Sequence, residues 1–133
     1  MLNPNVISKL RKIARIWSLV LIIIVFFIFG GYAWNWITTG VADPHAVEDY
    51  RPIENLAPLL EFLAVIGLTI AWRWERVGGI ITIISSLLVL PLLLTFWPLL
   101  SNLPNYLIAP YGTWLIILIP GVLFFLISFN VKK

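Results

Sequence analysis

Four long apolar stretches decide what this chain can fold into. The first holds the uninterrupted run LVLIIIVFFIF, and the other three are nearly free of charged side chains. A membrane-crossing helix needs about 20 mainly apolar residues, because roughly 30 Å of hydrocarbon offers no water to its backbone amides. The sequence therefore predicts four transmembrane helices, at residues 16–37, 56–74, 77–97 and 111–129.

These segments predict an all-α chain with a single membrane domain over residues 1–133. We expect a polytopic membrane protein folded as an antiparallel four-helix transmembrane bundle, since each short connection returns the chain across the bilayer. The connections are a polar and acidic outer loop at 38–55, a tight turn around 75–76 and a charge-free link at 98–110.

Composition excludes several classes of protein. Hydrophobic residues make up 61% of the chain and charged residues only 11%, whereas soluble domains have about 45–50% and about 25%. A soluble globular enzyme is therefore excluded. The chain has no cysteine, which excludes disulfide frameworks and cysteine nucleophiles. Because the sequence also lacks a nucleophile–base pair, a phosphate-binding loop and a dinucleotide fingerprint, we expect no enzymatic activity and no cofactor.

The distribution of positive charge predicts the orientation of the helices. With an even number of spans, both termini and the middle turn lie on one side, and eight of the nine basic residues fall there: Lys9, Arg11, Lys12, Arg15, Arg73, Arg76, Lys132 and Lys133. Only Arg51 falls on the other side. Because basic residues near span ends stay in the cytoplasm, we expect an inner (plasma) membrane protein with both termini cytoplasmic. The net charge of +3 is thus a topology signal, and nucleic-acid binding is not expected.

A cleaved signal peptide is the alternative interpretation of residues 16–37. The basic start fits a signal peptide, but the apolar core is longer than the usual 7–15 residues. The segment GYAWNW that follows offers bulky aromatic residues where a cleavage site has small ones. The tryptophans also fall near the ends of the predicted spans, where indole rings prefer the boundary between lipid and water. An uncleaved span is therefore the prediction.

Small residues predict where two of the helices pack. Helices in lipid associate through close contacts at small side chains. Such residues recur at helical spacing in the second and third predicted spans: Ala64, Gly67 and Ala71, and Gly78, Thr82 and Ser86. Because the turn between these spans is short, we expect the two stripes to face each other in the tightest hairpin of the bundle.

Glu61 is the one acidic residue inside a predicted span. An ionisable group at that depth is costly and is a candidate functional group, for exchanging a proton or holding a cation. The alternative is a structural carboxylate near the start of the helix, where the helix dipole favours negative charge. Asn35, Tyr106 and Tyr111 are the expected partners, since they fall at the same level of the membrane.

Two polar segments are weaker candidates for binding. In the outer loop, Asp43, His45 and Glu48 are metal-ligand residue types, but their spacing matches no established site, so no metal is expected. In WRWERVGG, Arg73 and Arg76 flank a tight turn beside two tryptophans. These arginines are candidates for contacting lipid headgroups, with a simple interfacial anchor as the alternative.

Four sequence segments resemble a known family. They are RIWS, GYAWNWITTGVADPHAVEDYRPIENL, AWRWERVGG and LIAPYGTW, and together they cover most of the chain. They are similar to small four-span prokaryotic integral membrane proteins that are classified as a domain of unknown function. The resemblance implies the four-span fold, and it brings no activity, ligand or catalytic residue.

Two classes of function remain open. The first is a structural or accessory membrane subunit that self-associates or joins a larger membrane complex in the lipid bilayer. The second is a small transporter or channel in which Glu61 couples to a proton or a cation. Small multidrug exporters also have four spans and one membrane glutamate, but theirs lies in the first span, where this chain has none. The first class is therefore the prediction.

Overall fold

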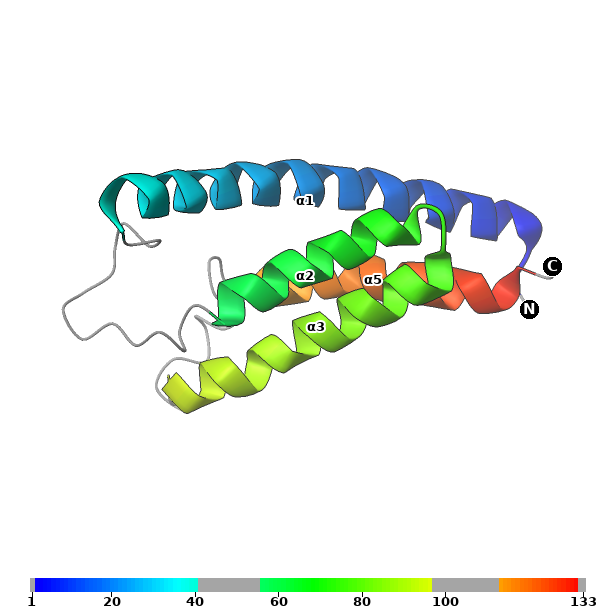
Figure 1. The fold of residues 1–133 in the computed structure, drawn as a ribbon. Helices are drawn as coiled ribbons and strands as arrows, with labels where there is room; N and C mark the ends of the chain where they lie inside the picture. Colours follow the sequence, from blue (N-terminus) through cyan, green and yellow to red (C-terminus); the bar gives the residue numbers. More distant parts are fainter. Residues whose placement is uncertain (1, 41–55, 97–112, 132–133) are drawn as a thin grey trace.

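The computed structural model describes residues 2–40, 56–96 and 113–131. Within these ranges the chain is entirely helical, as predicted, and contains no strand. The four helices are α1 (Pro4–Thr39), α2 (Leu56–Ala71), α3 (Glu75–Phe96) and α5 (Thr113–Asn130). Successive helices run in opposite directions, so the start of α1, the α2–α3 turn and the end of α5 lie together (Figure 1). At this end the backbone N–H of Leu2 donates a hydrogen bond to Asn130 Oδ1 at 3.3 Å.

Helix α1 is 36 residues long and begins at Pro4 rather than at residue 16. Its start has the features of a helix N-terminus, because Asn3 Oδ1 accepts the N–H of Asn5 at 3.0 Å and Pro4 has no N–H to satisfy. Its end is closed by Gly40, whose φ of 79° is left-handed and whose N–H donates to the Trp36 carbonyl at 2.9 Å. The basic residues before position 16 therefore lie on a continuous helix.

Helices α2 and α3 form an antiparallel hairpin, and they are the most closely packed pair. The turn occupies residues 72–74 instead of 75–76. It forms there because the N–H groups of Arg73 and Trp74 both donate back to the Ile70 carbonyl, at 3.1 and 2.9 Å, which closes α2. Glu75 then begins α3, where its charge suits the helix N-terminus.

The apolar core cluster lies among α1, α2 and α5, and α3 packs against α2 and α5 (Figure 1). Leu68, Ile117 and Phe124 are almost fully buried in this cluster, and Val89 of α3 and Ile127 of α5 are almost fully buried outside it. Three helices are long and apolar enough to cross a membrane, namely α1, α3 over Glu75–Leu92, and α5. Helix α2 has 16 residues and is shorter than its predicted span of 56–74, because the turn ends the helix at Ala71.

Candidate functional site

Thr82 lies where three helices meet. Its side chain is fully buried, and its Oγ1 is 2.9 Å from the carbonyl oxygens of both Ala64 in α2 and Gly78 in its own helix. The hydroxyl shares its proton between these two acceptors. Its methyl group faces α5, because a Cβ placed on Gly121 would lie 2.6 Å from Thr82 Cγ2. This one residue therefore joins α3 to both of its neighbours.

The α2–α3 contact is made by backbone against backbone. A Cβ on Gly67 would lie 2.6 Å from Thr82 Oγ1 and 2.8 Å from the Thr82 nitrogen. A Cβ on Gly78 would overlap the backbone nitrogen of Ala71 and the carbonyl oxygen of Gly67. The small residues named from the sequence at positions 64, 67, 71, 78 and 82 thus lie together between these helices.

Ser86 is the sixth residue of the two stripes. It is fully buried, and its Oγ has no hydrogen-bond partner within the ranges that the structure describes. An equivalent close contact, which was not predicted from the sequence, joins α3 to α5. A Cβ on Gly79 would lie 2.9 Å from the Phe125 nitrogen and 3.0 Å from the Gly121 carbonyl oxygen. In the sequence, this contact is indicated by the second glycine of the Gly78–Gly79 pair. Gly79 lies on a different face of α3 from Gly78 and allows α5 to approach closely there.

Glu61 lies in the second turn of α2, where it is partly buried. Thr113 begins α5, and its Oγ1 donates a hydrogen bond to Glu61 Oε1 at 2.6 Å. This bond ties the outer end of α2 to the start of α5. Two expected partners, Tyr106 and Tyr111, lie outside the described residues. Asn35 is in the last turns of α1, where its carbonyl oxygen accepts the Thr39 hydroxyl at 2.7 Å.

Thr113 is the partner of Glu61 that sequence reasoning missed. The sequence indicates this partner by position, because Thr113 directly follows LIAPYG at the outer start of the last apolar segment. Glu61 is expected at the same depth in the membrane. The hydroxyl is also one of the few polar groups near that start. A carboxylate inside a bundle needs a donor close by, since leaving it without a hydrogen bond is costly.

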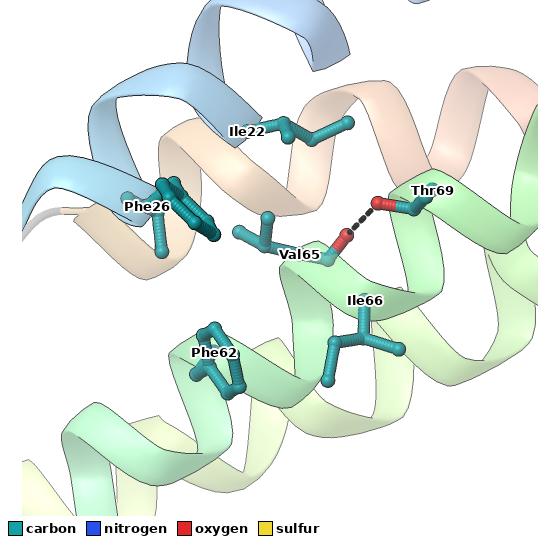
Figure 2. A pocket seen from close by; sticks show the side chains of 7 residues that line it. Ile22, Phe26, Phe62, Val65, Ile66 and Thr69 are labelled. Atoms are coloured by element: carbon teal, nitrogen blue, oxygen red, sulfur yellow. Dashed lines mark hydrogen bonds between the residues drawn. The ribbon is translucent and has the colours of Figure 1, made fainter. Parts of the chain in front are cut away.

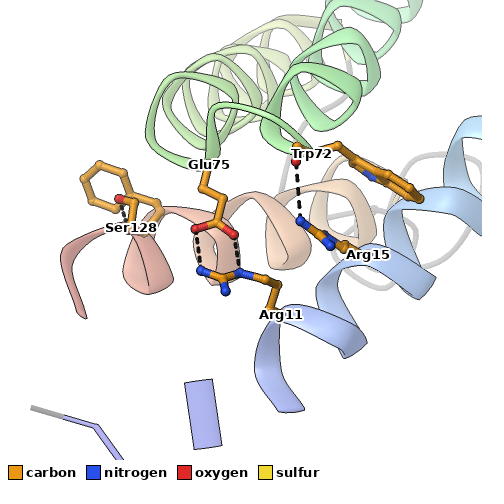
Figure 3. A network of polar contacts seen from close by, with 6 residues as sticks. Arg11, Arg15, Trp72, Glu75 and Ser128 are labelled. Carbon is orange, nitrogen blue, oxygen red and sulfur yellow. Dashed lines mark hydrogen bonds and ion pairs between the residues drawn. The ribbon is translucent and has the colours of Figure 1, made fainter. Parts of the chain in front are cut away.

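At the opposite end of the bundle, Arg11 and Glu75 form an ion pair between α1 and α3 (Figure 3). Arg11 Nε donates to Glu75 Oε1, and Arg11 Nη2 donates to Glu75 Oε2 at 3.1 Å. Such two-point contacts fix orientation as well as distance. Of the residues that the structure describes, Glu75 is the one acidic residue at this end of the bundle. A basic residue of another helix therefore has no other described acid there with which to form an ion pair.

A second polar connection at this end joins α1 to the α2–α3 turn. Arg15 Nη2 donates to the Trp72 carbonyl oxygen at 3.5 Å, and its guanidinium carbon lies 6.0 Å from the centroid of the Trp72 ring (Figure 3). Trp72 Nε1 donates to Ser18 Oγ at 2.8 Å, and Ser18 in turn donates to the Arg15 carbonyl at 2.9 Å. These three residues form a closed group around the indole.

Arg73 and Arg76, the candidates for headgroup contact, are both exposed and lie against aromatic rings. The guanidinium carbon of Arg73 is 5.8 Å from the Trp74 ring centroid, and that of Arg76 is 5.0 Å from the Phe129 ring centroid. Guanidinium groups over aromatic faces keep their charge available to other partners.

An apolar recess of about 150 Å³ lies between α1 and α2 and is partly open to the outside (Figure 2). Helix α1 contributes Ile22, Val25 and Phe26 to its lining. Helix α2 contributes Phe62, Val65, Ile66 and Thr69. The Thr69 hydroxyl donates to the Val65 carbonyl at 3.2 Å, so the one polar side chain in the recess is already bonded. Glu61 is not part of the lining.

Metal-binding chemistry has no support among the described residues, which contain no group of three or more His, Asp or Glu side chains that could hold an ion. The weak candidates Asp43, His45 and Glu48 lie outside the described ranges. Among the described residues, the polar contacts between helices are hydrogen bonds and one ion pair.

These features define an all-helical bundle in which three helices are apolar and long enough to cross a membrane. The chain belongs to the family described as a domain of unknown function, DUF7670, whose sequence model matches residues 3–133. Neither the curated proteins nor the solved structures contain a significant match to it.

Proposed function

We propose that this chain is a polytopic protein of the inner (plasma) membrane that serves as a structural or accessory subunit. The observation that carries the proposal is that two threonine hydroxyls, those of Thr82 and Thr113, make hydrogen bonds between helices inside the bundle. Thr82 bonds α3 to α2, and Thr113 bonds α5 to Glu61. These groups stabilise the bundle by satisfying one another where lipid offers no hydrogen bonds.

The exposed surface supports a membrane location. Phe26 and Phe27 on α1 are 73% and 77% exposed, and apolar side chains of α3 such as Ile84 are exposed as well. In water such surfaces would associate non-specifically, whereas in a bilayer they contact acyl chains. We propose the exposed apolar surface of α1 outside the recess, which includes Phe27, for self-association or for binding within a larger membrane complex.

The proposed orientation follows from the basic end of the bundle. In the described part of the chain, all six basic residues lie at the end formed by the start of α1 and the α2–α3 turn: Lys9, Arg11, Lys12, Arg15, Arg73 and Arg76. Basic residues beside membrane spans are retained in the cytoplasm. We therefore assign this end to the cytoplasm and the α2–α5 contact at Glu61 to the outer side.

Cysteine labelling tests this orientation without background, because the chain has no native cysteine. Asn5→Cys and Thr38→Cys place single thiols on exposed positions at opposite ends of α1. With a membrane-impermeant maleimide, we expect Thr38→Cys to be labelled in intact spheroplasts and Asn5→Cys only after permeabilisation. Labelling of Asn5→Cys in intact spheroplasts would reverse the orientation, and recovery of the chain in the soluble fraction would refute the membrane location.

The alternative function, a transporter that uses Glu61, is tested by Glu61→Gln. The glutamine keeps an oxygen that can accept the Thr113 hydroxyl, so we expect the variant to stay folded. In proteoliposomes loaded with a pH-sensitive dye, we expect no protein-dependent proton flux from either the wild type or Glu61→Gln. A flux that is present in the wild type and lost in Glu61→Gln would overturn the structural role.

A further inference from the structure

The apolar recess and Arg15 lie in line on the same pair of helices. Ile22 and Phe26 follow Arg15 by seven and eleven residues, so all three residues share one face of α1. Ile22 and Phe26 both line the recess. At a rise of 1.5 Å per residue, Arg15 lies about 10 Å from Ile22 towards the basic end.

The position of Arg15 is fixed over the gap between α1 and α2. Its guanidinium contacts both the backbone carbonyl and the ring of Trp72, the first residue after α2 (Figure 3). Trp72 follows Thr69 of the recess by a single turn. The gap between the two helices therefore has a hydrocarbon section in its middle and an arginine with an indole at its basic end.

The two arginines on this face of α1 differ in their charge balance. Arg11 is neutralised by the two-point contact with Glu75. Arg15 contacts the neutral carbonyl and ring of Trp72, and no acid of the described residues forms an ion pair with it. An uncompensated guanidinium is a good partner for a phosphate, since its planar donors match the phosphate oxygens.

We propose that the gap between α1 and α2 binds one anionic phospholipid, with its phosphate at Arg15 and one acyl chain in the recess. The proposal rests on the membrane location proposed above and adds a specific ligand to it. Charge complementarity selects the anionic headgroup, and the apolar lining suits a hydrocarbon chain because its hydroxyl, Thr69, is satisfied internally. Basic sites between helices on the cytoplasmic side of membrane proteins bind anionic headgroups in this way.

Native mass spectrometry of the full chain in mild detergent tests the headgroup contact. Phosphatidylglycerol and phosphatidylcholine are titrated separately into delipidated protein. We expect one phosphatidylglycerol to bind in preference to phosphatidylcholine, and Arg15→Gln to weaken that binding about fivefold, the effect of one basic residue at a membrane surface. The matched control is Lys9→Gln, which removes one positive charge from an exposed position six residues before Arg15, and therefore on another face of α1. We expect it to leave the affinity unchanged.

A second pair of variants tests the acyl-chain contact. Ile66→Trp fills the recess, whereas Ile84→Trp adds the same bulk to an exposed position of α3 outside it. We expect Ile66→Trp alone to reduce phosphatidylglycerol binding. Equal binding of the two lipids, equal losses for Arg15→Gln and Lys9→Gln, or equal losses for the two tryptophan variants would each overturn the proposal. The membrane location would survive any of these results, because membrane fractionation measures it independently.

Discussion

Replacing Gly78 with alanine is expected to lower the free energy of unfolding by about 3 kcal/mol, the upper part of the usual range for overpacking a close contact. The added methyl group would overlap the backbone of Ala71 and Gly67, and backbone atoms cannot move aside as a flexible side chain can. The α2–α3 hairpin must therefore open. Titration of the purified protein with a denaturing detergent, followed by fluorescence of its seven tryptophans, measures the change.

Gly31→Ala is the matched control, since Gly31 is also helical and a Cβ there would meet nothing within 4 Å. Alanine favours a helix over glycine, so we expect this variant to be more stable by about 0.5–1 kcal/mol. The same chemical change should thus have opposite signs at the two positions. Losses of similar size in both variants would show that the close approach at Gly78 is not what holds α2 to α3.

The second large effect is expected at Gly121, where alanine should cost about 2 kcal/mol of unfolding free energy. Its Cβ would lie 2.6 Å from Thr82 Cγ2 and 2.9 Å from Thr82 Cβ. Threonine is β-branched and has few rotamers, so it cannot turn its methyl group away without losing its bond to Ala64. The helix pair α3–α5 should loosen while α2–α3 remains in contact.

A compensating change makes this prediction specific. Thr82→Ser removes the methyl group and keeps the hydroxyl that bonds α2. In the double variant Gly121→Ala/Thr82→Ser, we expect part of the lost stability to return, because the closest of the two overlaps has gone. If the changes in unfolding free energy of the two single variants simply add up to that of the double variant, a direct contact between positions 121 and 82 is contradicted.

The positions of the helices could be predicted from the sequence because apolar length alone sets them. The full extent of α1 was also readable, since the pair Asn3–Pro4 is a typical helix start. The span predicted at residues 16–37 covers the apolar run alone and not the helix that this cap begins. Polar residues can continue a helix beyond the membrane, so an apolar run gives the length of a span and not the length of its helix.

Which helices pack together was predictable only where the connection between them is too short for any other arrangement. A turn of three residues forces α2 and α3 to be antiparallel neighbours, so their small residues could be matched in advance. The contacts Arg11–Glu75 and Glu61–Thr113 join segments 64 and 52 residues apart. Helices that are apolar on all sides carry no pattern that fixes their rotation, and the sequence therefore did not show which polar groups would meet.

The same connectivity determines the order in which the bundle can be completed during synthesis. The α2–α3 hairpin is local, so its glycine contacts can form as soon as Phe96 has been made. Of the four helices, α1 is made before the others, yet it packs partly against α5, which is made after them. Helix α1 must therefore wait for α5, and the bond from Leu2 to Asn130 can form only after Asn130 has been made. A chain that is truncated before Thr113 would leave its first helix only partly docked.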